Sequence, residues 1–305
     1  MKTLPLPNTS LNTSSIIHGC MRIANMKMTD AEVLLKTALD CGINFFDHAD
    51  IYGAGKSEEV FAKALKMNDK IREKIFIQTK CGIRKGFFDF SKEHIINSVD
   101  KSLKRLNTDY IDTFLLHRPD TLMEPEEVAE AFSELESSGK VRHFGISNHN
   151  SGQIALLQKY IEQKLIINQL QFSITNTGMI DRGLNVNMEN SPSLDHDGGI
   201  LEYCRLHDIR IQPWSPFMFG FFEGVFIDHP DFTELNIVLD RIAEEKHTNK
   251  NALVIAWILR HPAKMQPIVG TTNAGRLAQI CEATEIILTR EEWYEIYRAA
   301  GNVLP

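Results

Sequence analysis

Short apolar runs alternate with longer stretches of helical spacing along almost the whole chain. The runs with the length and composition of strands are Ser15–Cys20, Asn44–Asp50, Ile75–Lys80, Tyr110–His117, His143–Asn148, Asn168–Ser173, Ile209–Pro216 and Pro267–Thr271. A segment that can form a helix follows each of them. Eight strand–helix units in succession predict an α/β protein of the closed (β/α)8 TIM-barrel class, with a short N-terminal extension and a C-terminal helix.

Capping and turn residues indicate where the helices begin and end. Thr29 with Glu32 has the pattern of a capping box, and Cys41-Gly42 ends that helix. Ser91 is expected to cap a helix through Leu106, and Thr289 with Glu292 a final one through Ala299. Further helices are expected over Glu126–Ser138, Ser151–Gln163, Gly199–His207, Phe232–Lys246, Asn249–Arg260 and Ala274–Ala283.

Two stretches lack this regularity. Residues up to about Ser14 show no strong periodicity. The segment Ile174–His196 is rich in Asn, Gly and Ser and is long for a connection, which favours a substrate-facing loop at the carboxyl rim of the barrel. No repeat, low-complexity tract or linker divides the chain, so residues 1–305 are expected to form a single domain.

The composition excludes several classes of partner. The chain has 305 residues, 43% of them hydrophobic, and a net charge of −7 without a basic tract, which argues against nucleic acid or an anionic membrane. No run approaches a membrane span, and the N-terminus lacks the apolar core of a signal peptide. Five cysteines without metal or redox spacing favour reduced thiols and a cytoplasmic location. We expect a monomer or a weak homo-oligomer.

Four residues at the ends of successive apolar runs carry the clearest chemistry: Asp47, Tyr52, Lys80 and His117. The carboxyl ends of parallel strands gather at one rim, so these side chains are expected to meet. A free phenol has a pKa of about 10, and a nearby ammonium lowers it while a carboxylate holds the lysine in place. The set is suited to proton transfer to or from an oxygen.

Other motifs give weaker evidence for a phosphate-binding loop, a metal site or a Rossmann site. Gly53-Ala-Gly-Lys56-Ser57 resembles the end of a phosphate-binding loop but lacks its first glycine, and Ser57 is expected to cap a helix. Magnesium–ATP should therefore not raise the melting temperature. Asp195-His196-Asp197 has no metal-ligand spacing, and no metal site is expected. The absence of Gly-x-Gly-x-x-Gly argues against a Rossmann site but not against a nicotinamide cofactor.

Several segments together resemble the aldo-keto reductases, in family order from Gly19 to Arg276. They are Asn44–Gly53, Lys80, Ser98–His117, Gly139–Asn148, Asn168-Gln169, Trp214–Pro216 and Pro267–Thr272 with Arg276. The closest similarity is to bacterial reductases whose fourth strand runs into His117–Asp120. The resemblance implies NADPH-dependent reduction of an aldehyde or ketone. Tyr52 would be the general acid, or the base in the reverse direction. Lys80 would lower its pKa, Asp47 would pair with Lys80, and His117 would polarise the carbonyl.

The resemblance also implies cofactor contacts at individual positions. Trp214 would stack on the nicotinamide, while Ser147, Asn148 and Gln169 would bind its carboxamide. Ser147 and Asn148 would alternatively cap the next helix. The remaining contacts implied are Gly19, Cys20 and Asp47 near the first strands, Ser215 and Phe217 at the pyrophosphate, and Gly270, Thr271 and Arg276 at the adenosine end. Arg276 favours a 2′-phosphate. No lysine occupies position 270 or 273, so NADPH is expected over NADH by a reduced margin.

The substrate and the biological role stay open at this stage. Met21, Phe87, Phe88, Phe217–Phe222 and the Ile174–His196 segment would line the substrate pocket and favour an apolar or aromatic carbonyl compound. Arg118 fits either recognition of an anionic group or an outward ion pair with a structural carboxylate. The alternative function is that of a nucleotide-binding regulatory subunit resembling potassium-channel β subunits, with little turnover.

Overall fold

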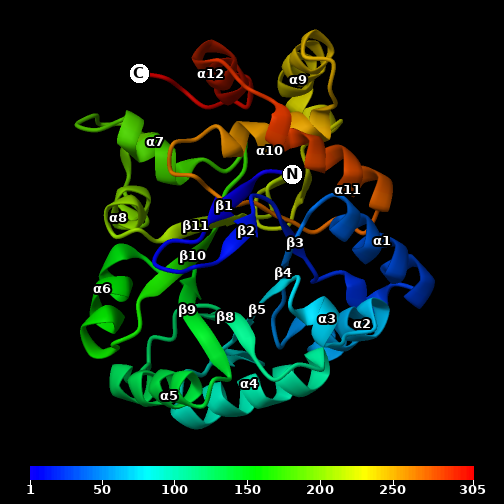
Figure 1. Cartoon of the computed structure of the whole chain (residues 1–305). Coiled ribbons are helices and arrows are strands. Elements are labelled where there is room, and N and C mark those ends of the chain that lie inside the picture. Colours follow the sequence, from blue (N-terminus) through cyan, green and yellow to red (C-terminus); the bar gives the residue numbers. More distant parts are fainter.

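The computed structural model describes residues 1–305 and contains an eight-stranded parallel sheet, nearly closed into a barrel (Figure 1). In spatial order the strands are β11 (Arg210–Trp214), β10 (Leu165–Gln171), β9 (Val141–Ser147), β8 (Ile111–Leu116), β5 (Phe76–Cys81), β4 (Phe45–Asp47), β3 (Ile17–Gly19) and β14 (Ile268–Val269). Main-chain hydrogen bonds link the segment that contains β14 to β3, from Ile17 N to Pro267 O (2.9 Å), and to β11, from Gln266 N to Ile211 O (3.0 Å). The expected (β/α)8 barrel is confirmed.

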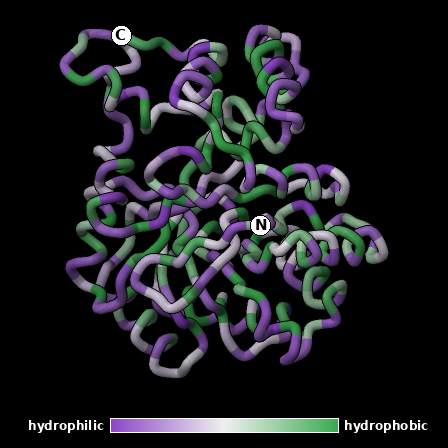
Figure 2. Tube along the Cα trace, turned by 45° about the horizontal axis from the view of Figure 1, so that its top comes forward, coloured by the Kyte–Doolittle hydropathy of each residue, from purple (hydrophilic) through white to green (hydrophobic).

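Helices surround the barrel on its outer side (Figure 1). They are α1 (Met28–Asp40), α2 (Lys56–Leu65), α3 (Asp69–Arg72), α4 (Lys92–Leu106), α5 (Pro125–Ser137), α6 (Ser151–Tyr160), α7 (Gly178–Leu184), α8 (Ile200–Leu206), α9 (Thr233–Glu245), α10 (Lys250–Leu259), α11 (Ala274–Cys281) and α12 (Arg290–Ala299). Apolar and polar residues alternate along many of them (Figure 2), because one face packs on the barrel and the other meets solvent. None has the length and apolar character needed to cross a membrane.

The helix caps agree with the sequence at some positions and not at others. Ser91 caps α4, with its Oγ accepting from His94 N at 3.3 Å, and Thr289 with Glu292 forms a capping box at α12. The capping box expected at Thr29 is wrong, because α1 already begins at Met28 and its N-cap, Lys27, makes no side-chain cap. The cap expected at Ser57 is also wrong, because Ser57 lies buried inside the first turn of α2 and donates to Cys20 O at 2.5 Å.

A hairpin that the sequence did not indicate closes the N-terminal end of the barrel. Strands β1 (Thr3–Pro5) and β2 (Asn12–Ser14) pair antiparallel before β3. Leu6 and Leu11, from the connecting turn, are buried in an apolar cluster with residues of the barrel strands such as Phe45 and Ile167. The hairpin therefore shields the barrel interior from solvent at the end opposite the strands' carboxyl termini.

The segment Ile174–His196 is ordered against the rest of the protein. It contains α7 and a short 3-10 turn at Ser191–Ser193. Asp181 accepts a hydrogen bond of 2.6 Å from the Tyr297 hydroxyl of α12, and Arg182 pairs with Asp197 at 3.0 Å and with Glu202 at 2.8 Å. Two other hairpins follow strands of the barrel: β6 (Ile83–Arg84) with β7 (Phe87–Phe88), and β12 (Met218–Phe219) with β13 (Gly224–Val225).

Candidate active site

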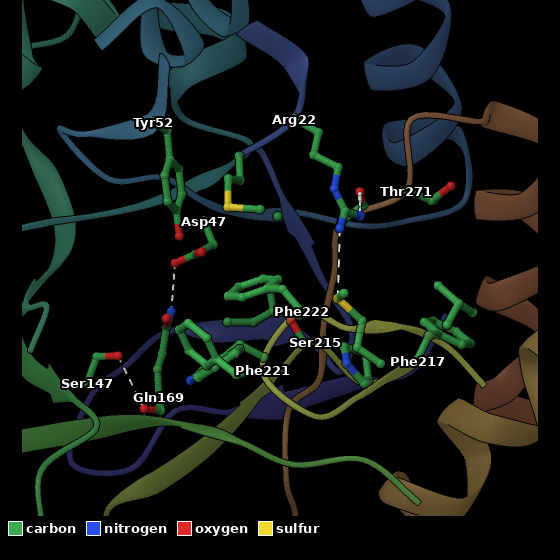
Figure 3. A pocket seen from close by; sticks show the side chains of 18 of the residues that line it. Arg22, Asp47, Tyr52, Ser147, Gln169, Ser215, Phe217, Phe221, Phe222 and Thr271 are labelled. Atoms are coloured by element: carbon green, nitrogen blue, oxygen red, sulfur yellow. Dashed lines mark hydrogen bonds between the residues drawn. The ribbon is translucent and has the colours of Figure 1, made fainter. Parts of the chain in front are cut away.

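A cavity of about 650 Å³ opens at the carboxyl ends of the barrel strands. Its wall includes residues that follow β3, β4, β8, β9, β11 and β14, together with the β12–β13 hairpin (Figure 3). Three members of the expected tetrad, Asp47, Tyr52 and His117, line it, and Lys80 lies directly behind Asp47. The barrel rim thus brings together the four residues that the strand ends indicated.

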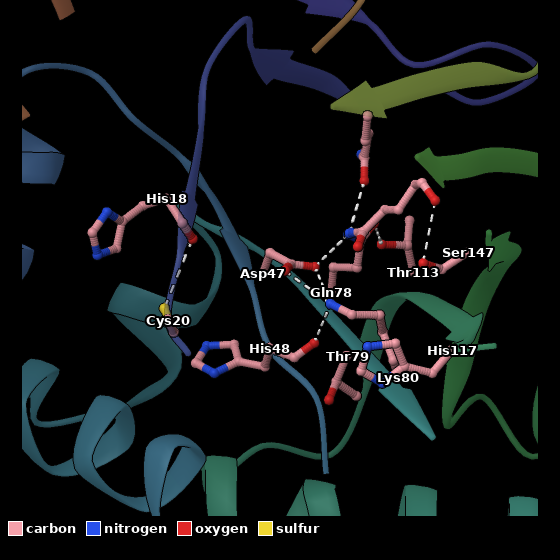
Figure 4. A network of polar contacts seen from close by, with 12 residues as sticks. His18, Cys20, Asp47, His48, Gln78, Thr79, Lys80, Thr113, His117 and Ser147 are labelled. Carbon is pink, nitrogen blue, oxygen red and sulfur yellow. Dashed lines mark hydrogen bonds and ion pairs between the residues drawn. The ribbon is translucent and has the colours of Figure 1, made fainter. Parts of the chain in front are cut away.

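Asp47 and Lys80 form a buried ion pair at the floor of the cavity (Figure 4). Lys80 Nζ lies 2.7 and 2.8 Å from the two carboxylate oxygens of Asp47 and 2.7 Å from His48 O. Gln78 and Gln169 each donate to Asp47 Oδ1 at 2.7 Å. Burial lowers the pKa of Lys80, and the carboxylate of Asp47 opposes that effect. The carboxylate therefore holds the ammonium in one place.

Glutamines form a hydrogen-bonded layer beneath this pair. Gln212 Oε1 accepts from Gln78 at 2.9 Å and from Gln169 at 3.2 Å, and its Nε2 donates to Gln266 at 3.2 Å. Thr113 completes the layer by donating to Gln78 Oε1 at 3.0 Å. Their signal in the sequence is weak: isolated polar residues within apolar strands, Gln78 standing two positions before Lys80. A satisfied polar layer of this kind fixes the orientation of Asp47.

Tyr52 and His117 face one another across the cavity. Their ring centroids are 6.0 Å apart at an interplanar angle of 84°, and Lys80 Nζ lies 5.2 Å from the Tyr52 ring centroid. Burial lowers the pKa of His117 well below its usual value, with the charges of Lys80 and Arg118 acting in the same direction. His117 is therefore neutral at physiological pH, and its Nδ1 has no hydrogen-bond partner.

The expected lowering of the Tyr52 pKa is wrong. Burial raises the pKa of Tyr52 well above its usual value, and the negative charge of Asp47 raises it further. Asp47 neutralises the ammonium of Lys80, which is why that cation does not bring the pKa down. The phenol is thus protonated at neutral pH.

A tight left-handed turn presents Tyr52 to the cavity. Gly53, Ala54 and Gly55 have φ values of 58°, 54° and 90°. A Cβ atom at Gly53 would approach the Cβ of Ala24 to 2.6 Å, so both the backbone conformation and the packing require glycine there. The Gly-Ala-Gly sequence that resembles a phosphate loop is used for this turn.

Polar residues after β9 and β10 connect the tetrad to Trp214. Asn148 Oδ1 accepts from the indole Nε1 of Trp214 at 3.1 Å, and Asn148 Nδ2 donates to Ser147 Oγ at 2.8 Å. Ser147 in turn donates to Gln169 O at 3.2 Å. Asn150, through a capping box, caps the following helix α6, which excludes the alternative in which Ser147 and Asn148 are the cap.

Aromatic rings from the β12–β13 hairpin cover Trp214. The Phe222 ring stacks on it with centroids 5.7 Å apart and planes inclined by 19°, and Phe221 packs edge-on at 6.3 Å. The hairpin is fastened to β10, since Gln171 donates to Gly220 O at 2.6 Å, and to the following turn, since Ser173 donates to Met218 O at 2.9 Å. One side of the cavity is therefore strongly apolar.

The opposite end of the cavity contains most of the residues expected at the phosphates and adenosine. Those lining it are Gly19, Ser215, Phe217, Gly270, Thr271 and Arg276. Cys20 is fully buried and does not line the cavity; its Sγ lies 3.8 Å from His18 O. Arg22 carries no motif in the sequence beyond its position after the first strand, yet it reaches this end and donates to Gly270 O at 3.3 Å.

The apolar wall differs from the one expected. Met21, Phe217, Phe221 and Phe222 line the cavity, but Phe87 and Phe88 are exposed on the β6–β7 hairpin and do not. No residue of the Ile174–His196 segment lines it either. Arg118, for which two orientations fit the sequence, turns into the cavity.

Comparisons with known proteins agree with this arrangement. A model of the aldo/keto reductase family matches residues 15–300. The chain is 38% identical to the oxidoreductase YcsN of Bacillus subtilis (strain 168), over 95% of this chain and 95% of that protein. It is 34% identical to the oxidoreductase YdhF of Escherichia coli (strain K12), over 94% and 93%, and 32% identical to a 6-dehydroglucose reductase of Agrobacterium fabrum, over 95% of each.

A solved structure has the same fold. A thermostable aldo-keto reductase, crystallised with the inhibitor epalrestat, gives a TM-score of 0.79 at 24% identity, covering 98% of this chain and 100% of that chain. The family match and the named relatives support reduction of carbonyl compounds in general. The chain belongs to the aldo-keto reductase family and is an NAD(P)H-dependent oxidoreductase.

Proposed function

We propose that the protein reduces an aldehyde or ketone to the alcohol with NADPH, reversibly, and that Tyr52 supplies the proton. The observation that carries this proposal is the position of the Tyr52 phenol, which lines the cavity between the buried Asp47–Lys80 pair and the ring of a neutral His117. A protonated phenol, a fixed ammonium and a neutral imidazole together can bind a carbonyl oxygen and give it a proton.

Each residue has a defined part in the proposed reaction. A nicotinamide nucleotide bound in the cavity would supply hydride for the carbonyl carbon. Tyr52 donates its proton to the carbonyl oxygen, and its raised pKa keeps that proton in place at neutral pH. The Lys80 ammonium lies 5.2 Å from the Tyr52 ring centroid, and its pairing with Asp47 limits how far it stabilises the phenolate that remains. General acid catalysis of this kind is typically worth about 10²–10⁴-fold.

The cavity has groups that fit a nicotinamide nucleotide. Trp214 offers an aromatic face, and Gln169 Oε1 accepts no hydrogen bond within the protein, so it is free to accept one from a carboxamide. At the far end neither Arg22 nor Arg276 is paired with a carboxylate. Two guanidinium groups suit nucleotide phosphates, and we propose NADPH as the preferred cofactor with NADH as a weaker one.

The direct test is NADPH oxidation with 4-nitrobenzaldehyde, an aromatic dione and 6-dehydroglucose, followed by near-ultraviolet absorbance, with NADH in parallel. The comparison is wild type against Tyr52→Phe. Tyr160→Phe makes the same chemical change at an exposed tyrosine of α6 and serves as the control. We expect turnover in wild type and the control, and its collapse in Tyr52→Phe while NADPH still binds.

The opposite outcome has a specific meaning. If wild type binds NADPH tightly but turns over none of these carbonyl compounds, the reductase proposal fails. The protein would then be better described as a nucleotide-binding regulatory subunit.

A further inference from the structure

Arg118 is an unpaired cation inside the cavity. It follows His117 directly, is half-buried, and lines the cavity beside Tyr52 and Trp214. Its guanidinium carbon lies 5.7 Å from the centroid of the Trp214 ring and 5.8 Å from that of Phe221, within the range of cation–π attraction. It makes no side-chain hydrogen bond and no ion pair with any other residue.

The other sheltered arginines behave differently. Arg72 pairs with Asp112 at 2.6 Å, Arg105 with Glu58 at 2.6 Å, and Arg182 with Glu202 at 2.8 Å. Arg210 donates to the main-chain oxygens of Lys264 and Pro5. Partial burial of a guanidinium without a polar partner is unfavourable. The N–H donors of Arg118, which have no partner in the protein, therefore require an explanation.

The surrounding charges do not compensate Arg118. The two carboxylates that line the cavity are Asp47, which is paired with Lys80, and Asp228, which is bonded to Lys250. Arg118 is close enough to Tyr52 that its charge opposes the rise in the pKa of that phenol. The guanidinium therefore lies near the place where the carbonyl group of a substrate would be reduced.

We propose that Arg118 binds the carboxylate of the substrate, and that the preferred substrates are oxo acids with an apolar or aromatic body. This inference rests on the proposed reductase function and specifies its substrate class. The planar guanidinium fork matches a carboxylate with two parallel hydrogen bonds. The rings of Trp214, Phe221 and Phe222 supply an apolar wall for the body of the same molecule.

The test compares acids with their methyl esters, which differ in charge but little in shape. The carbonyl of each ester is the more electrophilic of the pair, so a preference for the acid runs against intrinsic reactivity. The pairs are 4-carboxybenzaldehyde with methyl 4-formylbenzoate, and phenylglyoxylate with methyl phenylglyoxylate. We expect wild type to favour the acid of at least one pair in kcat/KM. Arg118→Met should lower kcat/KM for the acid roughly 10- to 100-fold, the range for hydrogen bonds to charged groups, and for the ester less than about 3-fold.

Two further variants separate charge from structure. Arg118→Lys keeps the charge but loses the fork, so it should recover part of the activity on the acid. Arg22→Met removes a cation from the opposite end of the cavity, and should weaken NADPH binding without changing the acid-to-ester ratio. Binding of benzoate to the NADP⁺ complex, measured by calorimetry, should be lost in Arg118→Met and should weaken with salt in wild type.

These experiments distinguish a failure of the inference about Arg118 from a failure of the reductase proposal. Equal use of acid and ester by wild type, or an equal fall in both in Arg118→Met, overturns the inference while reduction of the ester upholds the reductase function. If neither ester nor acid is reduced, the reductase proposal fails. Benzoate binding then decides on its own whether Arg118 is an anion site, and binding that persists in Arg118→Met refutes it.

Discussion

Replacing Lys80 with methionine tests whether the ion pair beneath the cavity supports the fold as well as the chemistry. The side chains of Lys80 and Asp47 are 1% and 4% exposed, so Lys80→Met leaves a buried carboxylate without a counter-charge. Asp47 Oδ1 keeps its two glutamine donors, whereas Oδ2 loses Lys80, its one partner. Removing one partner of a buried pair costs about 3–5 kcal/mol, and the retained donors place the expected loss near the lower limit, about 3 kcal/mol.

Urea unfolding measures this loss directly. The matched control is the double variant Asp47→Asn/Lys80→Met, in which the uncompensated charge is removed as well. We expect it to recover at least about 1 kcal/mol relative to Lys80→Met, because a neutral amide is less costly to bury than a carboxylate. A loss below about 1 kcal/mol in Lys80→Met, or a double variant no more stable than the single one, would refute the reasoning.

Three further predictions concern pH and cofactor binding. Because the pKa of Tyr52 is raised, the rate of carbonyl reduction should not fall up to about pH 9, whereas alcohol oxidation should rise with pH; a loss of reduction near pH 7 would contradict this. Burial lowers the pKa of His18 to about 4, so the folded state binds fewer protons than the unfolded state below pH 6.5, and stability should fall by about 3 kcal/mol towards pH 4. His18→Leu should reduce the difference in unfolding free energy between pH 7.5 and pH 5, measured by denaturant titration. An unchanged difference would exclude this contribution of His18. If the nicotinamide takes the Trp214 face that Phe222 covers, Phe222→Ala should bind NADPH about 2- to 10-fold more tightly in a fluorescence titration; weaker binding would place the nicotinamide elsewhere.

Local patterns were sufficient for the barrel and for the tetrad. The barrel strands are largely apolar because both faces of the sheet are covered, and most helices have one apolar face. These periodicities depend on neighbours in the chain, so the order of strands and helices can be derived from them. Asp47, Tyr52, Lys80 and His117 follow from the same pattern, since parallel strands end at one rim.

The boundaries and the short elements were harder to predict. The caps expected at Thr29 and Ser57 failed because serine and threonine fit the first turn of a helix almost as well as its cap. The β1–β2 hairpin has little periodicity of its own and is held by burying Leu6 and Leu11 in the barrel. The sequence of the Ile174–His196 segment is typical of a loop, because its order comes from contacts with residues outside it. Arg182 pairs with Asp197, and Asp181 accepts a hydrogen bond from Tyr297.

The barrel, the placement of the tetrad at one rim and the family resemblance can all be derived from the amino-acid sequence. The chemistry that depends on several strands at once follows only from the three-dimensional arrangement. Burial raises the pKa of Tyr52 and the charge of Asp47 raises it further. The glutamine layer joins β5, β10 and β11 to the segment before β14. Arg118 turns into a cavity whose two carboxylates are already paired with lysines. Charge, burial and hydrogen bonding are set by residues distant in the chain, and no local pattern contains that information.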